Sequence, residues 1–375
     1  MATLRTQPFE NVLIDHIELY VSDIATKTEW LVDGYGFAVY ATASGTAPDS
    51  HSIGHSIGRS IGLGRGGIRL VLTEPLASDH PGAAYVERHG DGVGDIALRV
   101  DDAAAAFDEA VRRGARPVSE PARHGDIVTA TIASFGDVAH TFVQRPDGGD
   151  ERALPGLRRL PAPAPGMDTT LTGIDHFAVC LEGGQLDPTV EFYESVLDFD
   201  MIFTERIVVG AQAMDSKVVQ SRSGAVTFTL IEPDLSQQPG QIDDFLRNHG
   251  GAGVQHIAFA AEDIVKAVGL ITSRGVEFLD TPASYYSLLP RRLRLARHTV
   301  DELQGLNVLV DEDHDGQLFQ IFSRSVHPRN TLFLEVIERL GARTFGSGNI
   351  KALYEAVELQ RARDEAAQRG ADKAA

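Results

Sequence analysis

The sequence predicts an α+β protein of two domains, each a pair of βαβββ modules whose sheets curl around a central space. Three observations support this class: a length of 375 residues, an internal duplication, and an order of strand, helix and further strands that occurs twice in each half. At roughly 150 residues per domain, the length favours two domains. With 43% hydrophobic and 23% charged residues, the chain can bury a sizeable core.

The two halves of the chain repeat one another. Residues 13–17 (LIDHI) resemble residues 173–177 (GIDHF), and residues 92–97 (GVGDIA) resemble residues 253–258 (GVQHIA). The spacing is 160 residues in the first pair and 161 in the second, so the register is kept. These alternating runs predict strands. Each strand of the second pair is followed by a helical stretch that ends at Arg-Gly, a common helix C-terminus.

The domain boundaries follow from composition. Residues 146–168 are rich in proline and glycine, which is typical of an exposed linker. We therefore assign residues 1–145 to a first domain, 146–170 to the linker and 171–375 to a second domain. Residues 349–370 place apolar side chains at helical spacing, which predicts a C-terminal helix that packs on the second domain.

Charge and cysteine content limit the classes of partner. A formal net charge of -19 would repel a phosphate backbone, so we expect a small-molecule ligand and no nucleic acid. Cys180 is the only cysteine, which excludes an internal disulfide and a thiolate metal cage. The start lacks a signal-peptide pattern, and no apolar run reaches the roughly 18 residues of a membrane helix. We expect a cytoplasmic homo-oligomer without a membrane partner.

Three residues of the second half have the chemistry of a divalent metal site: His176, His256 and Glu335. The two histidines occupy equivalent places in two repeated strands, so the duplication brings them close together. Glu335 lies in an apolar strand, residues 331–337, where an unpaired carboxylate costs several kcal/mol. Two histidines and one carboxylate on one face of an octahedral ion are typical of iron(II) oxygenases.

Other interpretations of these residues stay open. Zinc hydrolases also use two histidines and a glutamate, and a single strand histidine is more often a core or surface residue. The first half has Asp95 where the second has His256, and its last strand shows no evident third carboxylate. We therefore predict that the first domain is a metal-free copy.

Two further motifs resemble metal sites. Residues 311–316 (DEDHDG) match the opening of a calcium loop, but the closing glutamate of such a loop would fall at Phe322, inside a predicted strand. We interpret the motif as a hairpin turn. The tandem HSIG repeat offers His51 and His55, but its glycines favour a flexible loop insertion.

The second half contains the strings GVQHIAF, VEFLDTPASYY, DEDHDGQLFQIF, TLFLEVIER and FGSGNI. Together these strings resemble the 4-hydroxyphenylpyruvate dioxygenase family of the vicinal oxygen chelate (glyoxalase-like) superfamily. The resemblance covers most of residues 171–360 and extends more loosely to the first half. The resemblance implies iron(II) at His176, His256 and Glu335, with 4-hydroxyphenylpyruvate and O2 as substrates.

The family has two branches. One attacks the aromatic ring and forms homogentisate, and the other hydroxylates the benzylic carbon and forms 4-hydroxymandelate. The ring-attacking branch usually has Phe-Gly-x-Gly-Asn-Phe near its end and Asn before its Glu-Pro pair, whereas this chain has Ile350 and Ile231 at those places. An aliphatic wall lets the substrate pivot, and the loss of Asn removes a polar contact. These departures favour the mandelate-forming branch, with the homogentisate-forming branch as the alternative.

The resemblance also implies the lining of the substrate pocket. Polar and aromatic positions carried over from the family are Ser216, Gln241, Gln255, Gln320, Phe322, Phe333, Phe345 and Asn349. Their alternative roles are to satisfy strand backbones and to fill the core. A non-catalytic binding protein built on the same modules is a third possible function, but such a protein would not need an intact set of iron ligands.

Overall fold

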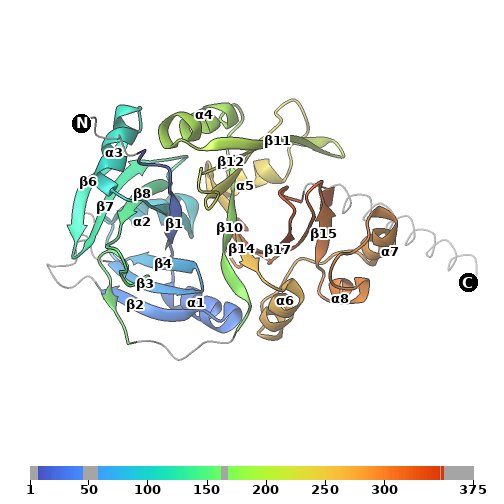
Figure 1. The fold of residues 1–375 in the computed structure, drawn as a ribbon. Helices are drawn as coiled ribbons and strands as arrows, with labels where there is room; N and C mark the ends of the chain where they lie inside the picture. Colours follow the sequence, from blue (N-terminus) through green and yellow to red (C-terminus); the bar gives the residue numbers. More distant parts are fainter. Residues whose placement is uncertain (1–6, 45–57, 162–167, 347, 350–375) are drawn as a thin grey trace, which may run out of the picture.

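The protein is described here by a computed structural model that covers residues 7–44, 58–161, 168–346 and 348–349. Figure 1 shows two curled sheets side by side, the first in blue to teal and the second in green to red, with helices around them. The predicted α+β class and the paired modules are confirmed. The C-terminal helix predicted for residues 349–370 and the HSIG repeat fall almost entirely outside the described residues.

The first domain contains two βαβββ modules and one nine-stranded sheet. The strand order is β6-β7-β8-β5-β1-β4-β3-β2-β9. Its elements are β1 (Leu13–Tyr20), α1 (Ile24–Glu29), the π-helix η1 (Trp30–Gly34), β2 (Ala38–Ser44), β3 (Gly58–Arg65), β4 (Ile68–Pro75), α2 (Pro81–His89), β5 (Gly92–Arg99), α3 (Ala103–Arg112), β6 (Pro117–His124), β7 (Ile127–Ala133) and β8 (Ala139–Gln144). The short β9 (Arg158–Arg159) lies in the segment between the halves and pairs with β2.

The second domain repeats this plan in an eight-stranded sheet of order β11-β12-β13-β10-β14-β17-β16-β15. Its elements are β10 (Leu171–Cys180), α4 (Leu186–Leu197), β11 (Asp200–Val209), β12 (Gln212–Gln220), β13 (Thr227–Pro233), α5 (Gln241–His249), β14 (Gly253–Ala261), α6 (Ile264–Ser273), α7 (Ala283–Arg292), α8 (Val300–Gly305), β15 (Leu309–Glu312), β16 (Gln317–Phe322) and β17 (Phe333–Leu340). In both domains the first strands of the two modules are antiparallel neighbours at the centre of the sheet.

The helices that follow β5 and β14 begin and end as their sequences predict. Asp102 and Asp263 cap α3 and α6, each accepting a hydrogen bond from a backbone N–H of the first turn. Beyond the C-termini, Gly114 and Gly275 adopt φ values of 109° and 89°, which glycine tolerates without strain. None of the described helices is long and apolar enough to cross a bilayer.

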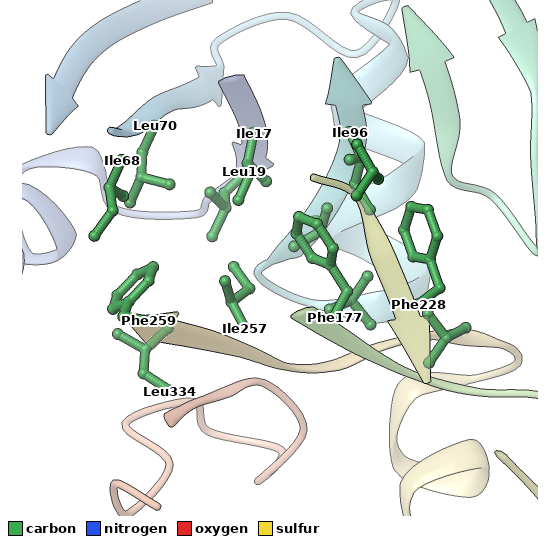
Figure 2. Packing of buried hydrophobic residues seen from close by; sticks show 14 of the residues in the cluster. Ile17, Leu19, Ile68, Leu70, Ile96, Phe177, Phe228, Ile257, Phe259 and Leu334 are labelled. Carbon is green, nitrogen blue, oxygen red and sulfur yellow. The ribbon is translucent and has the colours of Figure 1, made fainter. Parts of the chain in front are cut away.

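The two sheets pack against each other through one continuous apolar core. Figure 2 shows Ile17 and Leu19 of the first domain opposite Phe177, Ile257 and other apolar residues of the second. Because side chains alternate along a strand, the same strands turn polar residues to the opposite face of each sheet. Each domain therefore has one face in the shared core and one curled face that is available for a site.

This core predicts a strong stability effect at Phe177. Its ring is fully buried and stacks on Phe228 with 5.4 Å between centroids. We expect Phe177→Ala to destabilise the fold by about 3–5 kcal/mol, through lost burial and a cavity. Urea denaturation followed by circular dichroism measures the shift. Val208→Ala, at a side chain 59% exposed, is the control and should change the midpoint little. An equal midpoint for the two variants would contradict a core shared by both domains.

Candidate metal centre

His176, His256 and Glu335 meet on the curled face of the second sheet. They come from three adjacent strands, β10, β14 and β17. The Nε2 atoms of His176 and His256 lie 3.4 Å and 3.1 Å from Oε2 of Glu335. All three side chains are buried, and their ligand atoms lie within 4.8 Å of one another. The structure thus brings together the three residues that the sequence analysis selected.

Two β-bulges set the direction of these side chains. Ala178 pairs with His256 while Val179 pairs with Val254, so Gln255 is an extra residue in β14. The bulge lets Val254 face the shared core and His256 face the curled side, although residues two positions apart in a regular strand share one face. A second bulge makes Asp175 the extra residue of β10. Without these bulges, the alternation of side chains along the strands would turn a metal-ligand candidate away from the curled face.

Asp175 and Arg339 hold His176 from behind. The Nδ1–H of His176 donates to Asp175 over 2.8 Å, and the Arg339 guanidinium donates two hydrogen bonds, of 2.7 Å and 2.9 Å, to the same carboxylate. The pKa of Asp175 is lowered because these hydrogen bonds outweigh the effect of burial. An ionised Asp175 keeps a hydrogen on Nδ1, so Nε2 is the nitrogen that faces Glu335 and can bind either a proton or a metal ion.

The site is electrostatically prepared for a cation. Burial disfavours ionisation of Glu335, but the charge of His176 and hydrogen bonds from both imidazoles lower its pKa to about 2. Burial also disfavours the His176 imidazolium, yet Glu335 and Asp175 raise its pKa to about 9. For His256, burial dominates and lowers the pKa. A buried carboxylate that faces two imidazole nitrogens needs either a proton or a metal ion between them.

The spacing of the ligand atoms fits a divalent metal. Atoms bound about 2.1 Å from one ion lie about 3.0 Å apart in an octahedral arrangement and about 3.4 Å apart in a tetrahedral one. The separations of 3.1 Å and 3.4 Å agree with both. Donor type and spacing therefore support a metal ion at His176, His256 and Glu335, without choosing between iron and zinc.

Aromatic rings surround the three ligands. His256 stacks on Phe333 with centroids 5.1 Å apart and meets Phe322 edge-on at 5.6 Å. Phe345 contacts His176 edge-on at 5.1 Å, and the guanidinium of Arg339 lies 4.9 Å from the Phe345 centroid. The Nδ1 atom of His256 has no hydrogen-bond partner among the described residues, so the two phenyl rings orient that imidazole. The rings also keep water away from the ligands.

Ser216 and Ile231 lie on the same face of the sheet as His176. They pair directly across β12 and β13, and Ile231 pairs in turn with Cys180 of β10. Thr229 is a further residue of this face that the sequence analysis missed. Its buried hydroxyl has no partner among the described residues. Thr229 pairs with Ala178 of β10, two positions after His176. Its place two residues before Ile231 was the available signal.

Gln320 and Asn349 carry two buried amides beside Gly346, the residue after Phe345. Oε1 of Gln320 and Nδ2 of Asn349 have no partners among the described residues, whereas Oδ1 of Asn349 accepts a hydrogen bond from Tyr285 at 2.8 Å. Gly346 lies against the Gln320 amide, and its carbonyl accepts the backbone N–H of Asn349. Unpaired buried amides are rare in folded proteins, so a polar ligand is expected to use them.

Hydrogen bonds to the turn between β15 and β16 hold the segment that carries Phe345 in place. Residues 311–316 form a hairpin turn, as the sequence predicts. The carboxylate of Asp313 accepts backbone hydrogen bonds from Arg343 and Thr344, and Asp311 accepts one from Gly348. The carboxylates of Asp311 and Asp313 are therefore occupied by hydrogen bonds from backbone N–H groups.

The structure places the remaining predicted lining residues less centrally. Gln255 is half-buried at the bulge of β14, and Gln241 is exposed at the first residue of α5. Ile350 lies outside the described residues. Asp175, Arg339 and Thr229 are the functional candidates that the sequence analysis lacked. The repeated Asp-His pair, Asp15-His16 and Asp175-His176, was the signal that could have revealed Asp175.

A second group of metal-type side chains, Asp263, His298 and Glu338, is occupied by protein partners. Glu338 pairs with Arg297 at 2.7 Å and His298 at 3.0 Å, and accepts the backbone N–H of Ile264. Asp263 caps α6. These bonds satisfy both carboxylates, so the group serves as a structural network.

The first domain keeps the support of the site but loses a ligand. Asp15 binds Nδ1 of His16 at 2.7 Å and is held by Arg145, as Asp175 is held by Arg339. The pairing of β5 with β8 puts Thr141 at the place of Glu335. Thr141 donates its backbone N–H and its hydroxyl to Asp95. Among the described residues, the first domain contains no group of three metal-type ligands within 4.8 Å.

Comparison with known proteins agrees with this geometry. Residues 173–321 match the model of the Glyoxalase/Bleomycin resistance protein/Dioxygenase superfamily, and residues 52–154 match "Hydroxyphenylpyruvate dioxygenase, HPPD, N-terminal". The probable 4-hydroxyphenylpyruvate dioxygenase 2 of Aspergillus fumigatus is 36% identical over 94% of this chain and 95% of its own length. The chain belongs to the 4-hydroxyphenylpyruvate dioxygenase family. The enzyme of Dictyostelium discoideum is 33% identical over 92% of this chain and 97% of its own length.

A solved structure is also similar to this member of the 4-hydroxyphenylpyruvate dioxygenase family. It is a triple mutant of 4-hydroxymandelate synthase from Streptomyces coelicolor, with a TM-score of 0.81 and 45% identity over 95% of this chain and all of that one. The family and superfamily expected from the sequence strings are thus confirmed, and the chain is an enzyme of this dioxygenase family. The named relatives include both branches, so membership alone does not select the product.

The duplicated support gives a matched test of Asp175. We expect Asp175→Asn to weaken metal binding about 10-fold to 100-fold, because Asn cannot hold both the Nδ1–H of His176 and the charge of Arg339. Titration with Co(II) in competition with a chelator measures the affinity. Asp15→Asn makes the same change in the first domain and should leave the affinity unaltered. Equal losses in the two variants would instead indicate a general effect on folding.

Proposed function

We propose that the protein is an iron(II)-dependent dioxygenase that converts 4-hydroxyphenylpyruvate and O2 to 4-hydroxymandelate and CO2. The convergence of His176, His256 and Glu335 on one buried face carries this proposal. Family membership supports iron as the metal, and the 45% identity to a 4-hydroxymandelate synthase supports the product. Both atoms of O2 are accounted for, one in the new benzylic hydroxyl and one in the carboxylate that the 2-oxo carbon becomes when the original carboxylate leaves as CO2.

The division of labour between metal and protein follows from the geometry. Bound iron(II) would supply O2 activation and oxidative decarboxylation of the 2-oxo acid. His176, His256 and Glu335 would hold it on one side and leave the opposite side open to the curled face. No side chain needs to act as a general base. The protein would therefore bind and orient the substrate and exclude water.

The walls of the curled face determine how the aromatic ring would lie. Phe322, Phe333 and Phe345 flank the ligands, so the 2-oxo acid end of the substrate would lie among them. Gln320 and Asn349 offer unpaired amide groups for the polar atoms of the substrate. Ile231, on the same face, contributes an aliphatic wall where the ring-attacking branch has Asn. An aliphatic contact there favours reaction at the benzylic carbon.

The homogentisate-forming reaction is the second candidate. It starts from the same substrates and would use the same metal ligands. The relatives named 4-hydroxyphenylpyruvate dioxygenase, such as those of Aspergillus fumigatus and Dictyostelium discoideum, favour it. The two products are isomers, so chromatography of the aromatic product after incubation with iron(II), 4-hydroxyphenylpyruvate and O2 separates the candidates.

The metal ligands predict a clear difference between the two domains. His256→Ala should abolish both iron binding and turnover, because two ligands do not hold iron(II) in this geometry. His16→Ala, its control in the first domain, should leave one iron per chain. Iron content by atomic absorption and O2 uptake with an electrode measure the two effects. Retained iron and turnover in His256→Ala would move the site elsewhere, and loss of half the iron in His16→Ala would place metal in the first domain.

The pocket walls predict the product ratio. A tenfold change in ratio requires only about 1.4 kcal/mol between two barriers, which is comparable to one or two buried methylenes. We expect Ile350→Phe, and more strongly the double variant Ile350→Phe/Ile231→Asn, to raise the homogentisate fraction while O2 uptake continues. Because overpacking lowers the total rate, the ratio is the quantity to compare. An unchanged ratio in both variants would assign product choice to other residues.

A further inference from the structure

A small cavity lies between the two domains. Its volume is about 30 Å³, enough for one molecule of the size of water or O2. Leu19 and Leu70 of the first domain and Ile257 and Leu334 of the second contribute to its lining, and Figure 2 shows the two pairs opposite each other. All but three of the residues that line this cavity are apolar or aromatic.

The three polar residues of the lining leave little to hold a water molecule. Nζ of Lys27 pairs with Asp91 at 3.3 Å. Nδ1 of His327 accepts the backbone N–H of Arg329 at 3.1 Å. Nε2 of His327 has no partner among the described residues, but the ring edge that carries it lies against Gly90. Because a buried water makes about three hydrogen bonds, a lining of this kind favours an apolar occupant.

The cavity and the metal centre meet at the ring of Phe333. This ring lines the cavity and also stacks on His256 with centroids 5.1 Å apart. Ile257 and Leu334, which pair across β14 and β17, line the cavity as well. Each is the chain neighbour of a metal-ligand candidate, Ile257 of His256 and Leu334 of Glu335. The cavity and the ligands therefore lie on opposite faces of the same two strands.

The other end of the cavity reaches solvent. Val326 is 48% exposed, and Trp30 and Leu332 of the same lining are half-buried. An apolar passage thus leads from the surface at Val326 to Phe333, whose half-buried ring covers the metal centre. Such a passage admits a small apolar molecule and excludes water and ions, because a polar solute would lose its hydrogen bonds on entry.

We propose that this cavity binds O2 and delivers it to the metal centre past the ring of Phe333. The proposal rests on the proposed dioxygenase function, in which O2 is consumed at the three metal-ligand candidates. O2 is apolar and small, so transfer from water into an apolar cavity is favourable. The aromatic 2-oxo acid is too large for a volume of about 30 Å³ and approaches from the curled face. The two substrates therefore reach the metal by separate routes, and the bound acid does not block O2.

Paramagnetic relaxation by dissolved O2 tests the binding site. The sample is the full-length protein with Zn(II) bound, since this ion is diamagnetic and has no redox chemistry. Methyl relaxation rates are compared by NMR under O2 and under N2 at the same pressure. We expect a several-fold larger O2-induced increase at Leu70 and Leu334 than at Leu98, an equally buried leucine of the same core outside the cavity. An equal increase at all three leucines would overturn the binding site, whatever the reaction of the second domain.

A variant at the opening tests the delivery of O2 in the iron(II) enzyme. Val326→Trp should lower kcat/KM for O2 about threefold or more, because a narrower opening slows O2 association. Iron content and the KM for 4-hydroxyphenylpyruvate should stay unchanged, since the variant lies outside the curled face. Val208→Trp makes the same change at another exposed valine, on β11, and should leave all three quantities unaltered. O2 uptake at varied O2 concentration measures kcat/KM.

A second variant fills the cavity from within. Leu31→Phe, at a buried wall, should lower both kcat/KM for O2 and the O2-induced relaxation at Leu334. Unchanged kcat/KM for O2 in both Val326→Trp and Leu31→Phe would overturn the delivery. Absence of any turnover in the unaltered iron(II) protein would overturn the proposed function and the delivery with it, while the relaxation rates would still decide whether the cavity binds O2.

Discussion

The antiparallel pairing of β10 with β14 is the constraint on which the site depends. This pairing places His176 and His256 on adjacent strands, and the bulges at Asp175 and Gln255 turn both imidazoles to the curled face. The parallel pairing of β17 with β14 then adds Glu335. A slip of one residue in either ladder would move a ligand into the apolar core between the domains. Hydrogen bonds between the strands and that core together fix the positions of the three side chains.

Duplication explains how the chain can maintain such a demanding register. Both domains use the same bulged strand pair and the same Asp-His-Arg support, and their apolar faces cover each other. Because the scaffold is shared, two positions decide the chemistry of each curled face: Asp95 and Thr141 stand where the second domain has His256 and Glu335. Glu335 completes a tight group of ligands in the second domain, whereas Thr141 ties up Asp95 in the first. The first domain therefore stabilises the second through the apolar core that they share.

Product choice depends on much smaller energies than metal binding does. We expect loss of a metal ligand to remove the reaction, whereas a tenfold change in product ratio needs only about 1.4 kcal/mol between two barriers. Ile231 and its neighbours Ser216 and Thr229 lie on the same face of the sheet as His176. None of the three pairs with a metal-ligand candidate on a neighbouring strand. In the proposed reaction, walls of this kind would alter the position of the aromatic ring while His176, His256 and Glu335 keep their places.

The sequence by itself determined the duplication, the order of strands and helices, and the identity of His176, His256 and Glu335, because these depend on local patterns and on residue chemistry. Only the tertiary structure decided which face each side chain occupies. Bulges at Asp175 and Gln255 arise from pairing with a neighbouring strand, so alternation along one strand cannot reveal them. For the same reason the support of Asp175 by Arg339, 164 residues further along the chain, emerged only when distant strands were placed side by side.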